Sequence, residues 1–500
     1  MTGGAGSRGI PFRTRPPAAG KAGRGREGRG DVMGNAASME KFKAGLRGEL
    51  LQPGSPGYDT ARKVYNAMID RRPALIARCK DVADVIASVR FAGETGMLTA
   101  VRGGGHNAGG LGICDDGLVI DLSSMNGVRV DPWAKTIRVE GGCTWGGVDH
   151  ASHAFGLATP AGILSTTGVG GLTLGGGLGH LTRKCGLTID NLLAADMVLA
   201  DGRFVTASAE QNPDLFWAVR GGGGNFGIVT SFLFRGHPVH TVLAGPTLWE
   251  LEHAPEVLQR YRDFINTAPE EINGFFLFLS VPPGPPFPEP LHNRKMCGIV
   301  WCYAGPPDRF EETFRPVRRF PQPAFDMIGP MPYPALQSMF DGLYPPGQQW
   351  YWKADFIKEL GDEAIRLHVE HGSKLPTPQS TMHLYPVNGA ARRVEGNATA
   401  WSYRDATWAE VIVGVDPDPS NNERMTRWAN AYWNALHPHS AGGAYVNFMM
   451  HDEGQERVKA TYRGNYERLA KVKAMYDPEN FFRVNQNIQP AGKKSSRSAA

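Results

Sequence analysis

The chain has 500 residues, of which 41% are hydrophobic and 20% are charged, a composition typical of a water-soluble protein with a large buried core. No run of about 18 apolar residues occurs, which excludes an ordinary transmembrane helix. The net charge of +4 comes from residues 1–30, which hold seven Lys or Arg and one acid, so the remainder carries about −2. Neither nucleic acid nor a membrane is therefore an expected partner.

Residues 1–50 are expected to form a disordered, basic N-terminal extension. The first 30 residues are rich in Gly, Arg and Pro, show almost no apolar periodicity and lack the apolar segment of an ordinary signal peptide. Two interpretations stay open: a basic tail for targeting or nucleic acid, or an upstream start, with Met33 or Met39 as the true first residue. With no signal found, we expect a cytoplasmic location. Residues 493–500 are expected to be a disordered tail.

Residues 51–240 combine helix and strand signals with three glycine-rich segments. Apolar residues at helical spacing predict a helix over 81–96, followed by a short strand that enters the first segment, "VRGGGHNAGG" (101–110). The second is "TPAGILSTTGVGGLTLGGGLGHLTRKCG" (159–186), and the third lies in "DLFWAVRGGGGNFGIVTSFLFR" (214–235). Glycines permit positive φ and expose backbone N–H groups, so these segments are suited to cradle a polyanion such as a pyrophosphate.

Two common nucleotide-binding motifs do not explain the glycines. Gly222, Gly224 and Gly227 fit GxGxxG, but the β-branched and aromatic run that follows them predicts a strand, whereas a dinucleotide-binding unit needs a helix there. No glycine-rich segment continues into GK[ST], so a P-loop is excluded too. Any one segment alone could be a set of tight turns without a ligand. Three segments, the first with His106, favour one shared ligand.

Residues 241–440 mix strand-like runs such as "GFFLFLSV" with helix-like segments, and predict a second α+β domain whose sheet covers the first. Residues 453–477 predict a charged helix, and the apolar, amide-rich "PENFFRVNQNI" that follows is expected to return to the first domain. The six cysteines form no CxxC pair and no zinc-like spacing, so we expect reduced thiols and no metal site.

Four motifs, in order, resemble one known family: "VRGGGHNAGG", the second glycine-rich segment, "DLFWAVRGGGGNFGIVT" and "YVNF…YDPENFFRVNQNI". They resemble the berberine-bridge-enzyme-like FAD-linked oxidases of the vanillyl-alcohol-oxidase/PCMH flavoprotein group, over about residues 55–490. The resemblance implies an α+β fold with a PCMH-type FAD-binding domain (51–240). A substrate-binding domain (241–440) would cover the flavin with an antiparallel sheet, and a C-terminal segment (441–492) would return to the FAD domain.

The resemblance also assigns the cofactor residues. In the family, the histidine that ends the GGGH loop is bonded covalently to the 8α carbon of FAD, and His106 matches it; the alternative is that His106 only hydrogen-bonds the loop. Leu164 stands where many relatives have a cysteine that makes a second link, so a single attachment is expected. Thr167 matches a position that controls oxygen access in plant relatives, and its valine-like shape favours reaction with O2. The predicted FAD contacts are Arg102, Gly103, Gly104, Gly105, His106, Asn107, Thr166, Gly168, Gly170, Gly171, Gly175, Gly176, Gly177, Asn225, Gly227, Val229, Tyr445 and Asn447.

At the position where several family members have the catalytic base, this sequence departs from the family pattern. Several members have a tyrosine at the end of "YxNY", but this chain reads "YVNF", and Phe448 cannot ionise. A free phenol has a pKa of about 10, so a tyrosine base needs a lowered pKa, with Arg404 or Lys353 as possible helpers. Each candidate tyrosine has the alternative role of an aromatic pocket wall. The candidates are Tyr385, Tyr403 and Tyr445.

The resulting hypothesis is an FAD-dependent oxidase that moves a hydride from a C–OH or C–N centre of a small organic substrate to flavin N5, with O2 as the acceptor. Secondary metabolites and carbohydrates both fit the family. Two alternatives are a flavin dehydrogenase with another electron acceptor, and a flavin-binding protein that has lost its chemistry, for which Phe448 is the one hint.

Overall fold

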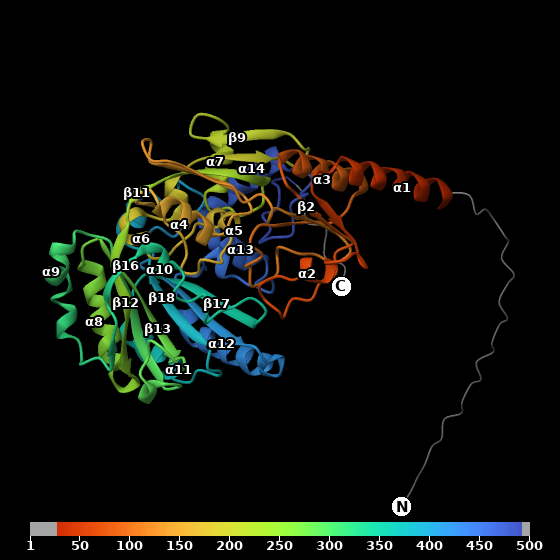
Figure 1. Ribbon diagram of the computed structural model, residues 1–500. Helices are drawn as coiled ribbons and strands as arrows, with labels where there is room; N and C mark the ends of the chain where they lie inside the picture. Colours follow the sequence, from red (N-terminus) through yellow and green to blue (C-terminus); the bar gives the residue numbers. More distant parts are fainter. Residues whose placement is uncertain (1–27, 493–500) are drawn as a thin grey trace, which may run out of the picture. The chain divides into compact units, whose positions relative to one another are not determined.

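The computed structural model describes the chain from residue 28 to residue 492 (Figure 1). Within the predicted N-terminal extension it contains helix α1 (Gly28–Gly45) and strand β1 (Glu49–Leu51), so the prediction of disorder is wrong for this part. Strong helix formers such as Ala, Met, Glu and Lys occur in α1, and β1 has a pairing partner in β2 (Leu75–Arg78). Residues 1–27 and the predicted tail 493–500 lie outside the described residues.

From Gly45 onward the described chain forms one compact unit. Its first sheet has the order β1-β2-β4-β3, with β2, β4 and β3 parallel. The predicted helix over 81–96 is confirmed as α3, where the Asp81 carboxylate accepts the Asp84 N–H (3.1 Å) and Gly96 ends the helix at φ 69°. The remaining elements here are α2 (Tyr58–Ala61), α3 (Val82–Thr95), β3 (Thr99–Arg102) and β4 (Leu118–Asp121).

The second sheet is antiparallel, in the order β5-β6-β10-β8-β9. The strand predicted after the third glycine-rich segment is confirmed as β10, which lies at the centre of this sheet. The elements of this part are β5 (Val128–Asp131), β6 (Thr136–Glu140), α4 (Trp145–His153), β7 (Leu157–Ala158), α5 (Val169–Leu174), α6 (Thr182–Cys185), β8 (Leu192–Val198), β9 (Phe204–Ser208), α7 (Pro213–Val219), β10 (Ile228–Arg235) and β11 (His237–Pro238).

The third sheet has eight antiparallel strands, with the main order β15-β12-β14-β13-β18-β19-β17 and β16 paired to β12. This confirms the predicted α+β class and the antiparallel sheet that was expected in residues 241–440. Helices α8, α11 and α12 pack on this part (Figure 1). The elements are β12 (Thr241–Glu250), α8 (Ala254–Thr267), β13 (Ile272–Ser280), β14 (Lys295–Tyr303), α9 (Phe310–Phe314), β15 (Phe325–Asp326), β16 (Gly329–Pro332), α10 (Tyr333–Gln337), β17 (Gln349–Ile357), α11 (Asp362–Gly372), β18 (Thr381–Pro386), β19 (Trp408–Asp416) and α12 (Asn422–Leu436).

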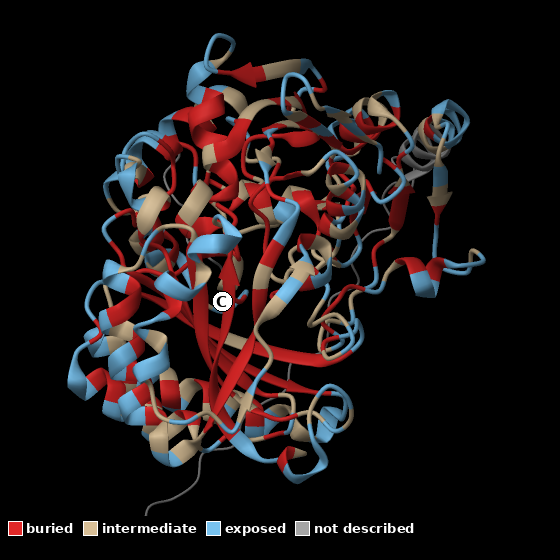
Figure 2. Cartoon of the chain, turned by 60° about the vertical axis from the view of Figure 1, so that its left-hand side comes forward, coloured by how far each residue is buried: buried red, intermediate tan, exposed pale blue. Residues whose placement is uncertain are grey.

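Side-chain alternation gives this sheet two buried faces, and Figure 2 shows its strands as mostly buried. Phe276, Phe278 and Ile412 pack with the helices, whereas Phe275 and Val413 face the glycine-rich segments. The second face is the one that takes part in the site described below. The boundaries at residues 240 and 440 stay predictions.

The C-terminal segment contains the short 3-10 turn Val446–Phe448, α13 (Gln455–Tyr462) and α14 (Tyr466–Tyr476). It is tied to the third glycine-rich segment through Asn225, whose side chain donates to the Gln486 carbonyl (3.2 Å) and accepts the Ile488 N–H (2.9 Å). The fully buried Lys473 ammonium donates to the Asn225 carbonyl (2.7 Å) and to Asp477 (2.6 Å). The segment "YDPENFFRVNQNI" therefore reaches the glycine-rich loops.

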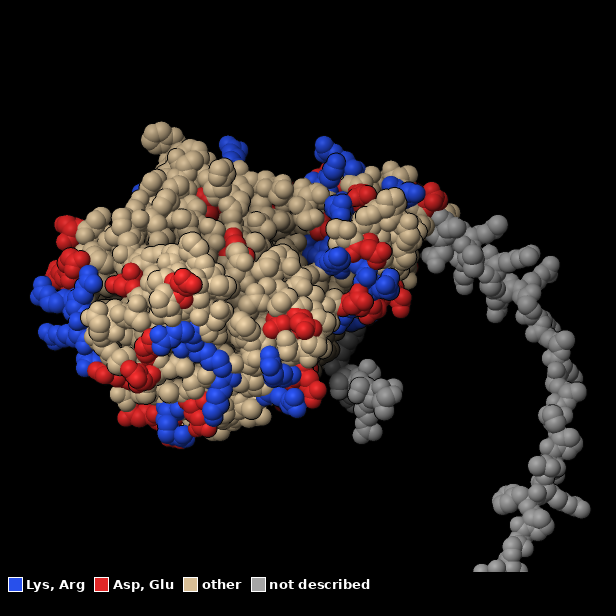
Figure 3. Space-filling view, turned by 60° about the horizontal axis from the view of Figure 1, so that its bottom comes forward, with Lys and Arg blue, Asp and Glu red and all other residues tan. Residues whose placement is uncertain are grey.

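Charged side chains of both signs occur on the surface. On the face drawn in Figure 3, basic and acidic side chains of the described residues are interspersed, which is not the single-sign stripe of a nucleic-acid-binding face. Among the helices of the described chain, none has both the length and the apolar character needed to cross a membrane.

Candidate functional site

One cavity of about 320 Å³ lies where the three glycine-rich segments, strands β17 to β19 and the C-terminal segment converge. Most of the predicted FAD contacts line it, although they come from sequence positions more than 300 residues apart. These are Arg102, Gly103, Gly104, Gly105, His106, Asn107, Gly168, Gly170, Gly171, Asn225, Gly227, Val229, Tyr445 and Asn447.

The glycines hold two chain segments in contact at the cavity wall. A Cβ atom on Gly104 would lie 2.5 Å from Gly168 Cα, and a Cβ on Gly168 would lie 2.5 Å from Gly104 N, so neither position accepts a side chain. Gly105 has φ 67°, in the left-handed region. In the described chain, the N–H groups of Gly104, Gly105 and His106 donate to no acceptor. The first loop is thus a cradle of free donors, which suits the phosphates of FAD.

His106 lies at the lip of this cradle. Its ring stacks on Tyr65 with 3.7 Å between ring centroids, and the Tyr65 hydroxyl is fixed by donating to the Tyr344 carbonyl (2.7 Å). The Nε2 atom of His106 is buried and has no partner within the described chain. Burial lowers the pKa of His106 to about 4, so the imidazole is neutral at neutral pH. An oriented, neutral and unpartnered ring nitrogen is what covalent attachment of a flavin requires.

Four predicted FAD contacts are not among the residues that line the cavity, and their contact with FAD stays a prediction: Thr166, Gly175, Gly176 and Gly177. Gly175 leaves room for Asn447, whose side-chain oxygen would lie 2.2 Å from a Cβ at this position. The Gly177 N–H donates to the Tyr445 hydroxyl (2.8 Å), which also accepts from Asn447 (2.7 Å). These glycines position the lining residues and do not form the wall themselves.

Arg102 lines the cavity, but its guanidinium is already paired. It donates to the Asp121 carboxylate (2.7 Å) in an ion pair whose side chains are both nearly inaccessible to solvent. This pair joins β3 to β4 directly before the glycine-rich loop. The backbone of that loop, more than the arginine charge, is therefore the expected phosphate contact.

The sheet contributes an aromatic wall. Ring contacts run from His106 through Tyr65 to Trp350 (5.1 Å), from Trp350 to Trp352 (5.9 Å) and from Trp352 to Phe448 (5.8 Å). The same series continues from Phe448 to Tyr385 at 6.0 Å. Phe448 is therefore part of the wall, and Tyr385 is its neighbour.

The three candidate bases have different environments. The Tyr385 hydroxyl lies 2.6 Å from His383 Nδ1 in the cavity, and His383 was missed by the sequence analysis although the i, i+2 spacing in β18 puts both on one face. The Tyr445 hydroxyl already accepts the two N–H groups described above. Tyr403 is not among the residues that line the cavity: its hydroxyl donates to the Ala460 carbonyl (2.9 Å) and its ring lies under Arg463, so its geometry lends no support to a role as the base.

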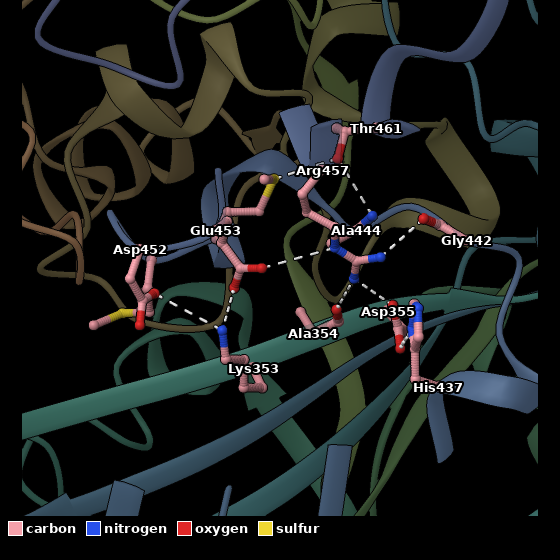
Figure 4. Close-up of polar contacts among 12 residues, drawn as sticks. Lys353, Ala354, Asp355, His437, Gly442, Ala444, Asp452, Glu453, Arg457 and Thr461 are labelled. Atoms are coloured by element: carbon pink, nitrogen blue, oxygen red, sulfur yellow. Dashed lines mark hydrogen bonds and ion pairs between the residues drawn. The ribbon is translucent and has the colours of Figure 1, made fainter. Parts of the chain in front are cut away.

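Neither proposed helper faces a candidate tyrosine in the cavity. Lys353 projects from the other face of β17 and pairs with Glu453 (3.0 Å), in a polar network with Asp355 and Arg457 (Figure 4). Arg404 pairs with Asp190 (2.6 Å). Instead of a lowered pKa, burial raises the pKa of Tyr385 and of Tyr445. A tyrosine in this cavity holds its proton at neutral pH.

Leu164 and Thr167 both line the cavity, at the positions where the resemblance predicts a second link and an oxygen gate. None of the six cysteines, all of them in the described chain and all free, lines it. The residues that line the cavity thus fit FAD.

Comparison with known proteins gives consistent matches. A family model described as "FAD binding domain" matches residues 73–208, and one described as "Berberine and berberine like" matches residues 444–489. A Bacillus subtilis FAD-linked oxidoreductase is 32% identical over 90% of this chain and 98% of its own length. The (R)-6-hydroxynicotine oxidase of Paenarthrobacter nicotinovorans is 30% identical over 89% of this chain and 98% of its own length.

Two solved structures of oxidases are similar to this chain in fold. That of 6-hydroxy-D-nicotine oxidase from Arthrobacter nicotinovorans has a TM-score of 0.79 at 28% identity, covering 89% of this chain and 98% of the other. Xylooligosaccharide oxidase from Myceliophthora thermophila has a TM-score of 0.79 at 23% identity, with 91% and 100% coverage, and shares the fold.

Proposed function

Since the chain belongs to the berberine-bridge-enzyme-like family of FAD-linked oxidoreductases, we propose that it is an oxidase with FAD bonded to His106 alone. The substrate is a small organic molecule with an oxidisable C–OH or C–N centre. Relatives named for 6-hydroxynicotine and for glucooligosaccharides support that range. When bound, FAD takes a hydride from the substrate carbon and passes the two electrons to O2, which becomes peroxide.

The single observation that carries the proposal is the state of His106. Its ring is held by Tyr65, its Nε2 has no partner in the described chain, and burial keeps it neutral at neutral pH. A purely structural histidine would be expected to satisfy both ring nitrogens in a buried setting. The free nitrogen belongs to the same loop as the unpaired N–H groups and would hold the flavin through its 8α carbon, with the 8α C–H and ring N–H protons lost and the two electrons taken up by the flavin itself.

Tyr385 is the group assigned to handle the substrate proton. Its hydroxyl, 2.6 Å from His383 Nδ1, is placed to accept the proton of a substrate hydroxyl while the hydride would pass to bound FAD. Burial raises the pKa of Tyr385 and lowers the pKa of His383 to about 3, so both side chains are neutral at rest and the pair would hold the extra proton only while the substrate is oxidised. Tyr445 instead holds Gly177 and Asn447 in place at the cavity wall.

Thr167 supports O2 as the electron acceptor. Its side chain is no larger than valine and lines the cavity, so it leaves more room for a small gas than leucine would. The two alternatives make different predictions. A dehydrogenase would turn over without consuming O2, and a catalytically silent flavin protein would be bleached by dithionite yet not re-oxidised by air.

The experiment is acid denaturation of the purified protein followed by a denaturing gel, with His106→Ala beside the wild type. Flavin fluorescence in the wild-type band that is lost in the variant is the expected result. A dark wild-type band with free flavin in the supernatant would leave the FAD fold and remove the covalent link. A dark band with no flavin at all would contradict the proposal. Peroxide formation during turnover then separates an oxidase from a dehydrogenase.

A further inference from the structure

Residues 444–453, here called the strap, pass around the outer edge of the third sheet. Strand β17 is the last strand in the sheet order and pairs with β19 on its inner side. Just before the strap, the Ala441 N–H donates to the Phe356 carbonyl (2.7 Å) and the Phe356 N–H donates to the Gly443 carbonyl (2.8 Å). The chain therefore follows the outer edge of β17, and the strap that continues from it contacts both faces of this strand.

On the cavity face, the strap is part of the wall. Tyr445, Val446, Asn447 and Phe448 line the cavity, and the Phe448 ring lies 5.8 Å from the Trp352 ring of β17. The Phe448 side chain has no polar atom of its own that could fix its place in the wall. Its position therefore depends on how the backbone of the strap is held.

On the face of β17 that packs against the helices, the strap is held by charged and polar side chains (Figure 4). Lys353 of β17 pairs with Glu453 (3.0 Å), and the Tyr351 hydroxyl donates to Asp452 (3.2 Å). Consecutive residues of a strand point to opposite faces of a sheet. Trp352 and Lys353 thus contact the two ends of the strap from opposite sides of the same strand.

Arg457 of α13 fastens the chain that follows the strap to the same edge (Figure 4). Its guanidinium donates to the Ala354 carbonyl (2.7 Å), to the Gly442 carbonyl (2.8 Å) and to the Asp355 carboxylate. The second carboxylate oxygen of Asp355 lies 2.9 Å from His437 Nδ1. The chain on both sides of the strap is therefore tied to β17 by directional contacts.

The charged groups of this network are nearly removed from solvent. The exposed fractions of the side chains are 10% for Lys353, 6% for Glu453, 10% for Arg457 and 1% for Asp355. Charges buried to this extent need a partner in good geometry. A strap that shifted along the edge, or moved away from it, would leave at least one of them buried and unpaired. The network therefore favours a single position of the strap.

We infer that the Lys353–Glu453 pair positions the flavin site: from the opposite face of the sheet, it holds Asn447 and Phe448 in the cavity wall. Neither member of the pair lines the cavity, so both are positioning residues that act through the strap. The inference rests on the proposed function, because bound FAD is the group that the strap faces.

The test uses the flavin-loaded full chain and Lys353→Met, which keeps the length of the side chain and removes its charge. Two quantities are measured: amide hydrogen exchange of residues 444–453, and the rate at which dithionite bleaches the flavin without air. Exchange in the strap is expected to become at least about tenfold faster, because the strap opens more often. Each opening also exposes the cavity, so bleaching should become at least about threefold faster.

Further variants separate positioning from general stability. Glu453→Gln should change both quantities in the same direction as Lys353→Met, and Lys353→Arg, which keeps a cation, should restore both. Arg262→Met is the matched control, because Arg262 joins α8 to α11 through Asp362 (2.8 Å) and its carboxylate partners lie outside the strap. It should leave strap exchange and bleaching at wild-type rates.

Two results would overturn the inference. Unchanged strap exchange in Lys353→Met and Glu453→Gln would show that the pair does not hold the strap. Faster exchange with an unchanged bleaching rate would show that the pair stabilises the strap without positioning the flavin site. If Lys353→Met does not fold, Glu453→Gln and the variant that carries both substitutions, which leaves no unpaired charge of this pair, give the same two readouts.

The two proposals can fail separately. Covalent flavin with an unchanged strap in both variants refutes the positioning role and leaves the oxidase intact. Flavin that is bound without a covalent link, together with the expected changes in exchange and bleaching, contradicts the proposed link and supports the positioning role. A protein without any flavin contradicts both, since the strap would then have no cofactor to face.

Discussion

The walls at the two ends of the cavity differ: one consists of backbone and the other of side chains. At the glycine-rich end the wall is backbone, with Gly104 and Gly168 so close that no Cβ fits between them. At the sheet end the wall is made of large side chains that alternate along β17, β18 and β19. A wall of backbone suits a ligand common to the whole family, because any side chain added there blocks it. A wall of side chains can change its specificity one residue at a time without disturbing the strands.

The largest effect is expected from adding a side chain at the glycine-rich end of the cavity. Gly104→Val would place its Cβ 2.5 Å from Gly168 Cα and 2.6 Å from Gly168 N, so the two segments must separate. We expect near-complete loss of bound flavin, together with a destabilisation of about 1–3 kcal/mol from overpacking. The ratio of flavin to protein absorbance and the urea midpoint measure the two effects.

Gly93→Ala is the control for that substitution. Gly93 lies in α3, where an added Cβ meets nothing within 4 Å. Alanine there should keep full flavin loading and raise stability by about 0.5 kcal/mol, through the better helix propensity. Normal flavin content in Gly104→Val would show that the close approach is not needed for the cofactor.

This contrast explains what the sequence could predict. The glycine-rich end is a contiguous motif with an obligatory residue type, so His106, Gly104 and Gly168 were identifiable from sequence. The sheet end depends on which strand face each residue occupies. Lys353 was misplaced because it lies one residue from Trp352 in the sequence but on the opposite face of β17. His383 could have been predicted to lie beside Tyr385, because residues two apart in a strand point to the same face of the sheet.

Contacts between distant segments set a second limit on what the sequence predicts. Tyr403 and Gly175 to Gly177 support the site through contacts between distant segments, such as the Gly177 N–H with the Tyr445 hydroxyl, 268 residues apart. No local pattern distinguishes a residue that lines a cavity from one that holds the lining in place. The ion pair of Arg102 with Asp121 depends in the same way on the register of β3 and β4.

The anchoring of the C-terminal segment offers the next test of the glycine-rich end. Lys473→Met leaves Asp477 buried without its cation and removes the bond to the Asn225 carbonyl. Breaking such a buried pair costs about 3–5 kcal/mol, and flavin should dissociate more readily because Asn225 lines the cavity. Urea unfolding with flavin fluorescence measures both.

Lys459→Met supplies the control, since Lys459 makes an exposed pair with Glu456 and its loss should cost less than about 1 kcal/mol. Equal effects of the two substitutions would show that the buried lysine has no special role in holding the segment.

The contact between helices α4 and α10 should respond to pH. Asp149 of α4 is buried against Gln337 of α10, and burial raises the pKa of Asp149 to about 7. The unfolded carboxyl has a pKa of about 3.9, so the folded state binds more protons between those values and stability falls as pH rises from about 4 to 7. Asp149→Asn should remove this part of the pH dependence.

The size of the expected change in unfolding free energy follows from the raised pKa of Asp149. Relative to Asp149→Asn, the wild type should lose about 2–4 kcal/mol of unfolding free energy over that range and remain constant above it. Urea unfolding of both proteins at several pH values provides the measurement. Parallel pH profiles would mean that Asp149 is ionised in the folded protein.

The smallest expected effect concerns only the electron acceptor. Thr167→Leu adds bulk to the cavity wall without a charge, so substrate binding and anaerobic flavin reduction should stay near the wild-type rate. Re-oxidation of the reduced flavin by O2 should slow at least about tenfold, equivalent to about 1.4 kcal/mol in the barrier. Thr167→Val keeps the shape and removes the hydroxyl, so it should re-oxidise like the wild type. Stopped-flow mixing of reduced protein with aerated buffer measures this step alone. If valine slows the reaction as much as leucine does, the Thr167 hydroxyl controls the reaction with O2, and the space beside it does not. The glycine-rich end would then contribute a side chain to the chemistry in addition to the backbone that binds the cofactor.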